Sequence, residues 1–227
     1  MLLDGLDKLR GTGLKTRLLH PHEELLDRWL GVRTSGWRPH VGDEHDPNWR
    51  VEYVPAPYAV LRRVLRRVGL GPDDVFVDLG AGMGRAVFAA SWLGARRAVG
   101  VEIDPALVAT ARANLSRSRL RDRQVEFVEC GAESYPQDQS TVLFMFNPFG
   151  AGTMAAVARQ IDDGLTKNPR NLRVVYVNPF FASTLDALPC LERIDDWDDH
   201  QDQRDFFSRW RPAGGWGARF WRSVKPR

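Results

Sequence analysis

The sequence predicts an α/β fold, in which a parallel β-sheet is covered by helices on both faces. Three observations support this fold class. The chain has 227 residues, 43% of them hydrophobic, which suits one domain with one substantial core. From residue 57 onward, short apolar runs alternate with helical patterns, as in a sheet of parallel strands. The first apolar run, Val75–Leu79, leads directly into a glycine-rich turn, the place where such sheets bind ligands.

The N-terminal part differs in character from the rest. We expect residues 1–56 to form a helix and loop cap, ahead of the main unit at 57–227. The helix is expected over Pro21–Leu30, and a polar stretch rich in glycine and proline follows it. Four of the five histidines and three of the eight tryptophans fall in this part. It either covers a site or packs as an arm on the domain, and the sequence leaves both alternatives open.

The main unit begins with a helix near Pro57, in which Leu61, Val64, Leu65 and Val68 share one face and arginines fill the other. Strands are then expected at 75–79, 98–103, 125–129, 141–146 and 172–177. Helices are expected between or after them at 85–93, 105–115, 154–165 and 182–188. Two final strands are expected at 191–194 and 218–221, separated by a polar segment at 195–205 and a turn. No linker or internal repeat divides this unit.

Composition excludes several classes of function. The 32 basic and 29 acidic residues give a net charge of +3, and this balance argues against a nucleic-acid partner. Only four of the basic residues are lysines. The two cysteines form no metal or redox spacing, and the N-terminus lacks the pattern of a signal peptide. No run of about 20 apolar residues could cross a membrane. We therefore expect a cytoplasmic protein without a membrane partner.

The turn after the first strand carries the first chemical signal. Its glycines follow the spacing G-x-G-x-G from Gly80, and Arg85 stands where a dinucleotide-binding motif would have its third small residue. Asp78 lies two residues before Gly80 and would repel a pyrophosphate, whereas it would attract a cationic ligand. Glu102 ends the second strand, where an acid can accept hydrogen bonds from a ribose. An adenosine-containing cofactor without phosphate fits this pattern.

The segments 78–84, 99–105 and 147–149 resemble the successive motifs of class I S-adenosylmethionine-dependent methyltransferases. The resemblance covers roughly residues 57 to 223. It implies a Rossmann-like, doubly wound, seven-stranded sheet that is mostly parallel with an antiparallel last strand. It also implies S-adenosyl-L-methionine as cofactor.

The resemblance further implies which residues bind the cofactor. They are Tyr53, Asp78, Gly80, Ala81, Gly82, Glu102, Ile103, Ala132, Glu133 and Asn147. The glycine turn would lie beside the methionine part, Glu102 on the ribose hydroxyls and Ile103 against the adenine. One position departs from the family pattern, because Gly131 stands where an acid usually meets the adenine amino group. The backbone near Ala132 or the Glu133 carboxylate would have to replace that contact.

The acceptor side is predicted from Asn147-Pro148-Phe149, which follows the fourth strand. This tripeptide resembles the Asn/Asp-Pro-Pro-Tyr/Phe motif of amino-directed methyltransferases, although the second proline is missing. We therefore expect Asn147, Pro148 and Phe149 to be catalytic and the acceptor atom to be nitrogen. A second Asn-Pro-Phe ends the fifth strand, where proline would also simply stop a strand. The candidate substrate contacts are Tyr58, Asn178 and Phe180.

The leading functional hypothesis is a methyltransferase that acts on a small molecule or short peptide, at nitrogen. A protein or nucleic-acid methyltransferase, docking through arginine faces at 62–67 and 117–123, is the first alternative. A catalytically silent cofactor-binding partner is the second. The acidic run at 195–200 raises the possibility of a metal site, but its position favours a solvated loop. The sequence leaves the acceptor, the pathway and the oligomeric state open.

Overall fold

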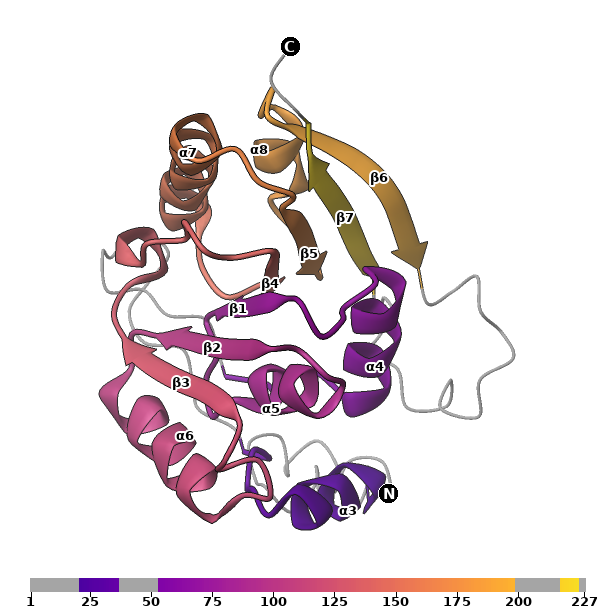
Figure 1. Cartoon of the computed structure of the whole chain (residues 1–227), viewed down its shortest axis with the longest axis vertical. Helices are drawn as coiled ribbons and strands as arrows, with labels where there is room; N and C mark the ends of the chain where they lie inside the picture. The colour runs from indigo at the N-terminus through magenta and orange to yellow at the C-terminus, as the bar shows by residue number, and fades with distance from the viewer. Residues whose placement is uncertain (1–20, 37–52, 199–216, 225–227) are drawn as a thin grey trace, which may run out of the picture.

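A seven-stranded sheet forms the centre of the molecule (Figure 1). The computed structural model describes residues 21–36, 53–198 and 217–224. Its strands are β1 (Val75–Leu79), β2 (Arg97–Glu102), β3 (Gln124–Glu129), β4 (Val142–Phe146), β5 (Arg173–Val177), β6 (Leu191–Asp198) and β7 (Gly217–Ser223). They lie in the order β3-β2-β1-β4-β5-β7-β6, and β7 runs antiparallel to both of its neighbours. The predicted fold class is confirmed.

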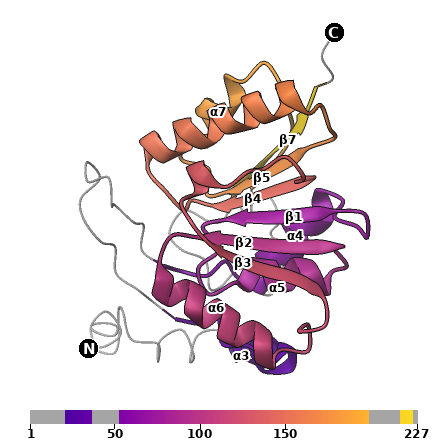
Figure 2. The same ribbon diagram turned by 60° about the vertical axis from the view of Figure 1, so that its left-hand side comes forward.

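Helices cover both faces of this sheet (Figures 1 and 2). One face carries α3 (Pro21–Leu30), α4 (Tyr58–Arg67), α5 (Arg85–Trp92) and α6 (Pro105–Arg117), whose buried residues join one core. The other face carries the short 3-10 helix η1 (Ala132–Ser134), α7 (Ala151–Lys167) and α8 (Ala182–Asp186), whose buried residues join a second core. None of the described helices is both long and apolar enough to span a membrane.

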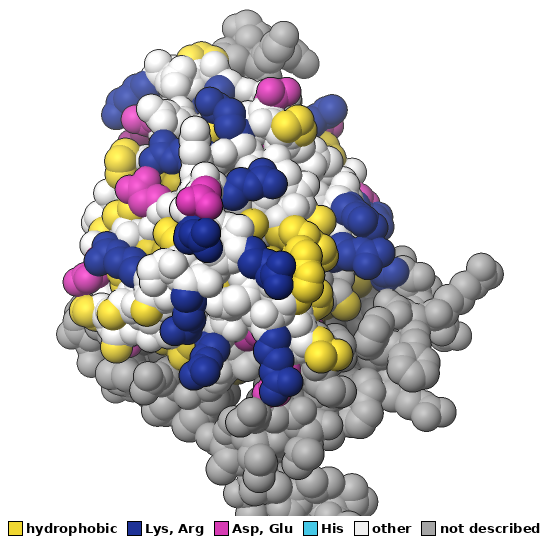
Figure 3. Space-filling view, turned by 60° about the horizontal axis from the view of Figure 1, so that its bottom comes forward, with side chains coloured by type: hydrophobic (Ala, Val, Ile, Leu, Met, Phe, Trp, Pro, Cys, Tyr) yellow, Lys and Arg dark blue, Asp and Glu magenta, His cyan; other side chains and the backbone are white. Residues whose placement is uncertain are grey.

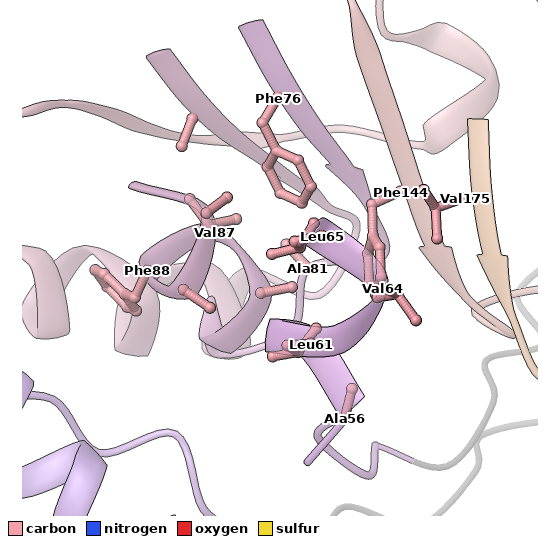
Figure 4. Packing of buried hydrophobic residues seen from close by; sticks show 14 of the residues in the cluster. Ala56, Leu61, Val64, Leu65, Phe76, Ala81, Val87, Phe88, Phe144 and Val175 are labelled. Carbon is pink, nitrogen blue, oxygen red and sulfur yellow. The ribbon is translucent and has the colours of Figure 1, made fainter. Parts of the chain in front are cut away.

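The first core is built from aromatic and branched side chains between the sheet and α4 and α5. Figure 4 shows Phe76 and Phe144, from the adjacent strands β1 and β4, facing Leu61, Leu65 and neighbouring residues of the helices. The rings of Phe76 and Phe144 lie 5.9 Å apart. All four of these side chains are at most 1% exposed. The apolar stripe predicted for α4 therefore forms the contact with the sheet.

The N-terminal segment packs into this same core. Leu30 and Val32 are 0% and 3% exposed and belong to the cluster that includes α4 and α5. Tyr58 begins α4 and is also buried. The proposed boundary at residue 56 stays a prediction, since most of residues 1–56 lie outside the described part. The histidines and tryptophans singled out at positions 20, 37, 40, 45 and 49 lie there too.

The prediction that the strand ends at residue 194 and that a polar segment spans 195–205 is wrong for the first four residues of that segment, because β6 continues to Asp198. Arginines on neighbouring elements explain why acidic residues suit this strand. Asp195 pairs with Arg67 of α4, and Asp196 pairs with Arg219 of β7 at 3.4 Å. These carboxylates are engaged in ion pairs along an edge strand, and the remainder of the predicted segment lies outside the described residues.

The arginine face of α4 is only partly open to solvent. Arg63 lies over the Trp197 ring at 5.6 Å, and Arg67 lies over the Phe220 ring at 5.9 Å. Such packing of a guanidinium on an aromatic ring stabilises the contact between a helix and a sheet. Figure 3 shows Lys and Arg side chains spread over one face of the molecule, with Asp and Glu side chains lying between them. Arg63 and Arg67 of α4 therefore stabilise the packing of the helix on the sheet as well as forming part of the surface.

Replacing Gly100 of β2 with alanine is expected to lower the free energy of unfolding by about 1–3 kcal/mol. An added Cβ would lie 2.7 Å from Cδ1 of Phe127 and 2.8 Å from Cβ of Ala81, inside the core. Gly152→Ala in α7 is the matched control, because no atom lies within 4 Å of its added Cβ. It is expected to keep or slightly raise the stability. Equal unfolding midpoints in urea for both variants would contradict the packing described here.

Candidate cofactor and acceptor site

The predicted site residues meet at the carboxyl edge of the sheet, where β1 lies between β2 and β4. The backbone amides of Gly80 and Ala81 both donate to the carbonyl oxygen of Val101 on β2, at 2.8 and 2.9 Å. These bonds fasten the glycine turn to the neighbouring strand. The turn then opens into α5, whose N-cap is Gly84. A ligand at this turn would meet backbone groups at close range.

Gly80 and Gly82 adopt backbone angles that favour glycine, with φ of 90° and 54°, as does Gly84 at the end of the turn with φ of 92°. Gly80 and Gly82 are also covered closely by side chains from distant parts of the chain. A Cβ at Gly80 would overlap Pro148, and a Cβ at Gly82 would overlap the Tyr53 ring. The structure thus brings together the turn, the predicted acceptor motif and the predicted N-terminal tyrosine.

Asp78, at the end of β1, is a buried carboxyl group that is 4% exposed. Burial, and after it the nearby Glu102 carboxylate, raise the pKa of Asp78 well above its ordinary value. Within the described part of the chain, no ion pair or side-chain hydrogen bond is found for Asp78. A buried acid of this kind favours a cationic ligand, because such a ligand would compensate the cost of ionisation.

Glu102, at the end of β2, holds the turn in shape. Its carboxylate accepts hydrogen bonds from the amides of Gly82 at 2.8 Å, Ile103 at 2.8 Å and Asp104 at 2.9 Å. Each carboxylate oxygen has further lone pairs that could accept from a ribose diol. The Ile103 side chain is 47% exposed beside it, which leaves an apolar surface open to an adenine ring.

The adenine end is completed by the segment after β3. Cys130 donates its amide to the Glu102 carbonyl at 3.1 Å, so this segment lies beside the acid at the end of β2. Ala132 is buried in η1, and the exposed Glu133 side chain folds back onto Gly131. The segment that carries the two residues expected to replace the family acid therefore lies beside Glu102. Their contact with adenine stays a prediction.

On the other side of β1, the two Asn-Pro-Phe segments follow the adjacent strands β4 and β5. Asn147 and Asn178 both have positive φ, 40° and 49°, which Asn tolerates better than most residues. The Tyr176 hydroxyl lies 3.5 Å from Oδ1 of Asn147, and burial raises the pKa of Tyr176 to about 12. Phe149 is 8% exposed and joins the core on the α7 face, whereas Phe180 is 78% exposed.

Tyr58 lies apart from this group. It is 3% exposed, and its hydroxyl donates to Asp27 at 2.7 Å. It stands in a buried cluster around Arg85, which also contains Glu23. Sequence reasoning missed this cluster, although an arginine directly after the glycine turn, at a position that must be buried, was a usable signal. We do not include Tyr58 in the acceptor site proposed below.

The fold matches that of solved methyltransferases. A structure of an RNA methyltransferase from Salinibacter ruber in complex with S-adenosyl-L-homocysteine superposes with a TM-score of 0.57 at 22% identity, covering 77% of this chain and 96% of that one. A putative methyltransferase from Escherichia coli superposes with a TM-score of 0.56 at 17% identity, covering 84% and 100%. The chain therefore has the Rossmann-like fold of these methyltransferases.

Matches in sequence are shorter. Residues 53–148 of this chain match the family model of the histone methylation protein DOT1. A protein-lysine N-methyltransferase from Saccharolobus islandicus is 35% identical over 97 residues, which cover 42% of this chain and 60% of the relative. The chain spans 60% or less of the length of the curated relatives that it matches. The matched segment runs from Tyr53 to Pro148 and so contains the glycine turn and Asn147.

The residues at this site fit S-adenosylmethionine, whose product S-adenosyl-L-homocysteine is bound in the Salinibacter ruber structure. Asp78 would provide a buried acid for a cationic amino acid end, Glu102 would provide an acceptor for ribose hydroxyls, and Ile103 would provide an apolar surface for adenine. Two carboxylates near the turn would disfavour a phosphate-bearing ligand. Among the described residues, no group of three His, Cys, Asp or Glu is placed to hold a metal ion.

Asp78→Asn is expected to weaken binding of S-adenosylmethionine about 10- to 100-fold, because a hydrogen bond to a charged group contributes about 1.5–3 kcal/mol. Affinity of the wild-type protein should fall as the pH is lowered through the raised pKa of Asp78, since only the ionised carboxyl attracts a cation. The asparagine variant should lose that dependence. Isothermal calorimetry across pH measures both effects.

The same substitution should stabilise the ligand-free protein at neutral pH. Because the pKa of Asp78 is raised in the folded state, the folded protein binds more protons and loses stability as pH rises above the ordinary carboxyl value. Asparagine removes this loss. Asp73→Asn, at an exposed position before β1, is the control and should change neither property. Unaltered cofactor affinity in Asp78→Asn would argue against the placement of the cofactor.

Proposed function

We propose that this chain transfers a methyl group from S-adenosylmethionine to a nitrogen atom, and that the acceptor is the side-chain amine of a lysine in a peptide or protein. The observation that supports the nitrogen acceptor most directly is the position of Asn147. It directly precedes Pro148, which packs on Gly80 of the cofactor turn. An amide at this place lies beside the region where the cofactor meets its acceptor.

Methyl transfer requires few dedicated residues of the protein. When bound, S-adenosylmethionine supplies a methyl group attached to a positively charged sulfur. The acceptor nitrogen would take the methyl group, and the sulfur would leave as a neutral thioether. The Asn147 carboxamide oxygen and the Pro148 backbone carbonyl would accept hydrogen bonds from the amine. This would hold the nitrogen lone pair in line with the methyl group. The amine must lose one proton before it attacks, and water can take that proton at neutral pH.

The lysine acceptor is supported by the relatives that share residues 53–148. Their names describe a histone methylation protein and a protein-lysine N-methyltransferase, and the shared segment includes the acceptor motif. The exposed Phe180 ring, next to Asn178 at the same edge of the sheet, offers an apolar contact for the aliphatic stem of a lysine. A small-molecule amine, the other acceptor class that the sequence predicts, is an outcome of the test below.

Both cysteines of the chain, Cys130 and Cys190, are free thiols. This supports the expectation of a reducing, cytoplasmic setting for the reaction.

Asn147→Gly is expected to lower kcat about 100-fold, in the range found when one oriented polar group is removed from an active site. Glycine suits the φ of 40° at this position, so the loss would report the missing amide rather than a distorted backbone. Asn171→Gly, at an exposed position at the other edge of the sheet, should keep the wild-type rate. Full activity in Asn147→Gly would show that the acceptor lies elsewhere.

The acceptor class is tested by mass spectrometry. After incubation with S-adenosylmethionine, lysine-containing peptides and proteins should gain methyl groups, and matched sequences with arginine in place of lysine should gain none. Methylation confined to small amines would overturn the lysine assignment and favour a small-molecule substrate. Methylation of an oxygen atom would overturn the nitrogen-directed role proposed for Asn147. Methylation of a nucleic-acid base would overturn the assignment of lysine as the acceptor.

A further inference from the structure

Arg85 is a buried cation that the proposed reaction does not use. It is the first residue of α5 and directly follows the glycine turn. Its side chain is 4% exposed. Burying a guanidinium is costly unless partners surround it. Among the described residues, the side chains that it contacts through hydrogen bonds and ion pairs come from residues 23–35, in and after α3.

These contacts use each nitrogen of the guanidinium. Nε donates to Oγ1 of Thr34 at 2.7 Å, and one terminal nitrogen donates to Oε2 of Glu23 at 2.6 Å. The other terminal nitrogen donates to Oγ of Ser35 at 2.8 Å and lies 3.8 Å from Oδ2 of Asp27. Arg85 therefore ties the start of α5 to the N-terminal segment at four points.

Asp27 shapes the segment that Arg85 holds. Its carboxylate accepts from the Thr34 amide at 2.7 Å, the Thr34 hydroxyl at 2.7 Å and the Ser35 amide at 3.2 Å. The amide of Val32 also donates to the Asp27 carbonyl at 2.8 Å. Residues 32–35 are thus folded back onto α3 independently of Arg85, and Arg85 fixes this folded segment against the cofactor turn.

The folded segment reaches the turn through Tyr53. The Tyr53 hydroxyl donates to the carbonyl oxygen of Thr34 at 2.8 Å, while its ring covers Gly82. Gly36, two residues after Thr34, lies against the Met83 side chain, where an added Cβ would be 3.1 Å from Cε. A continuous series of contacts therefore leads from Arg85 through Thr34 to Tyr53 and to the glycine turn.

We propose that Arg85 is a positioning residue for the cofactor, which sets affinity for S-adenosylmethionine by holding residues 34–36 and Tyr53 over the turn. It acts through Tyr53 and does not touch the ligand. The proposal relies on the cofactor binding at the turn but does not depend on which acceptor is methylated. The N-terminal segment then belongs to the cofactor site, and Arg85 fastens it there alongside the hydrogen bonds that Tyr58 and Asn114 make with the same segment.

The test must separate positioning from stability. Glu23→Gln with Arg85→Met removes the ion pair and leaves the net charge of the cluster unchanged, while Asp27 keeps its donors from Thr34 and Ser35. We expect this double variant to fold and to bind S-adenosylhomocysteine at least tenfold more weakly in calorimetry. The KM for S-adenosylmethionine should rise in parallel, whereas kcat and the KM for the acceptor should stay within twofold.

A second, partly buried ion pair is the control. Asp74 and Arg173 form an ion pair at the amino edge of the sheet, away from the turn. Asp74→Asn with Arg173→Met should lower the unfolding temperature and leave the Kd for S-adenosylhomocysteine within twofold. Arg85→Lys keeps the charge but loses the forked geometry, and it should weaken binding by a smaller factor, which keeps the test decisive even if the double variant unfolds.

Tyr53→Phe completes the test, because it removes only the hydrogen bond to Thr34. If Arg85 acts through this bond, the loss of affinity in Tyr53→Phe and in the Glu23/Arg85 double variant should not add when the three changes are combined. Additive losses, or wild-type affinity in the double variant, would overturn the proposal. Intact cofactor binding without methyl transfer to lysine would instead count against the proposed function alone.

Discussion

The close packing around the glycine turn is the constraint on which the rest of the structure depends. Side chains from three distant segments occupy the space that side chains on the turn would need: Tyr53 from the N-terminal part, Phe127 from β3 and Pro148 from the end of β4. Because interiors tolerate little overlap, the turn can close only when these segments are in place. The ligand site and the fold are therefore assembled by the same contacts.

Local patterns made most of the fold predictable. The helix over Pro21–Leu30 and the strand over Val75–Leu79 have the predicted bounds, since apolar periodicity and a following turn define such elements without distant information. Asp78, Gly80 and Glu102 could also be selected, because their chemistry depends on fixed spacing within strand–turn–helix units. The structure brings these residues together at the carboxyl edge of the sheet.

What could not be predicted depends on partners far apart in the sequence. Asp195 lies in a strand and pairs with Arg67, which is 128 residues away in the sequence. The residues around Asp195 do not indicate this ion pair. Arg85 looked like a mismatch in a nucleotide-binding motif, yet it is the centre of a buried cluster with Glu23 and Thr34. Long-range ion pairs are chosen by the three-dimensional fold, and a single sequence does not reveal them.

The direction of α7 has a consequence for self-modification. This helix starts at the carboxyl edge of the sheet, after β4, and its 17 residues end at Lys167, about 25 Å further on at 1.5 Å per residue. Lys167 is the one lysine among the residues that the structure describes. If the chain acts on lysine amines as proposed, this lysine lies at the far end of the helix, beyond reach of the reacting atoms of its own molecule. Automethylation at Lys167 would need a second enzyme molecule, and its rate would rise with the square of the enzyme concentration.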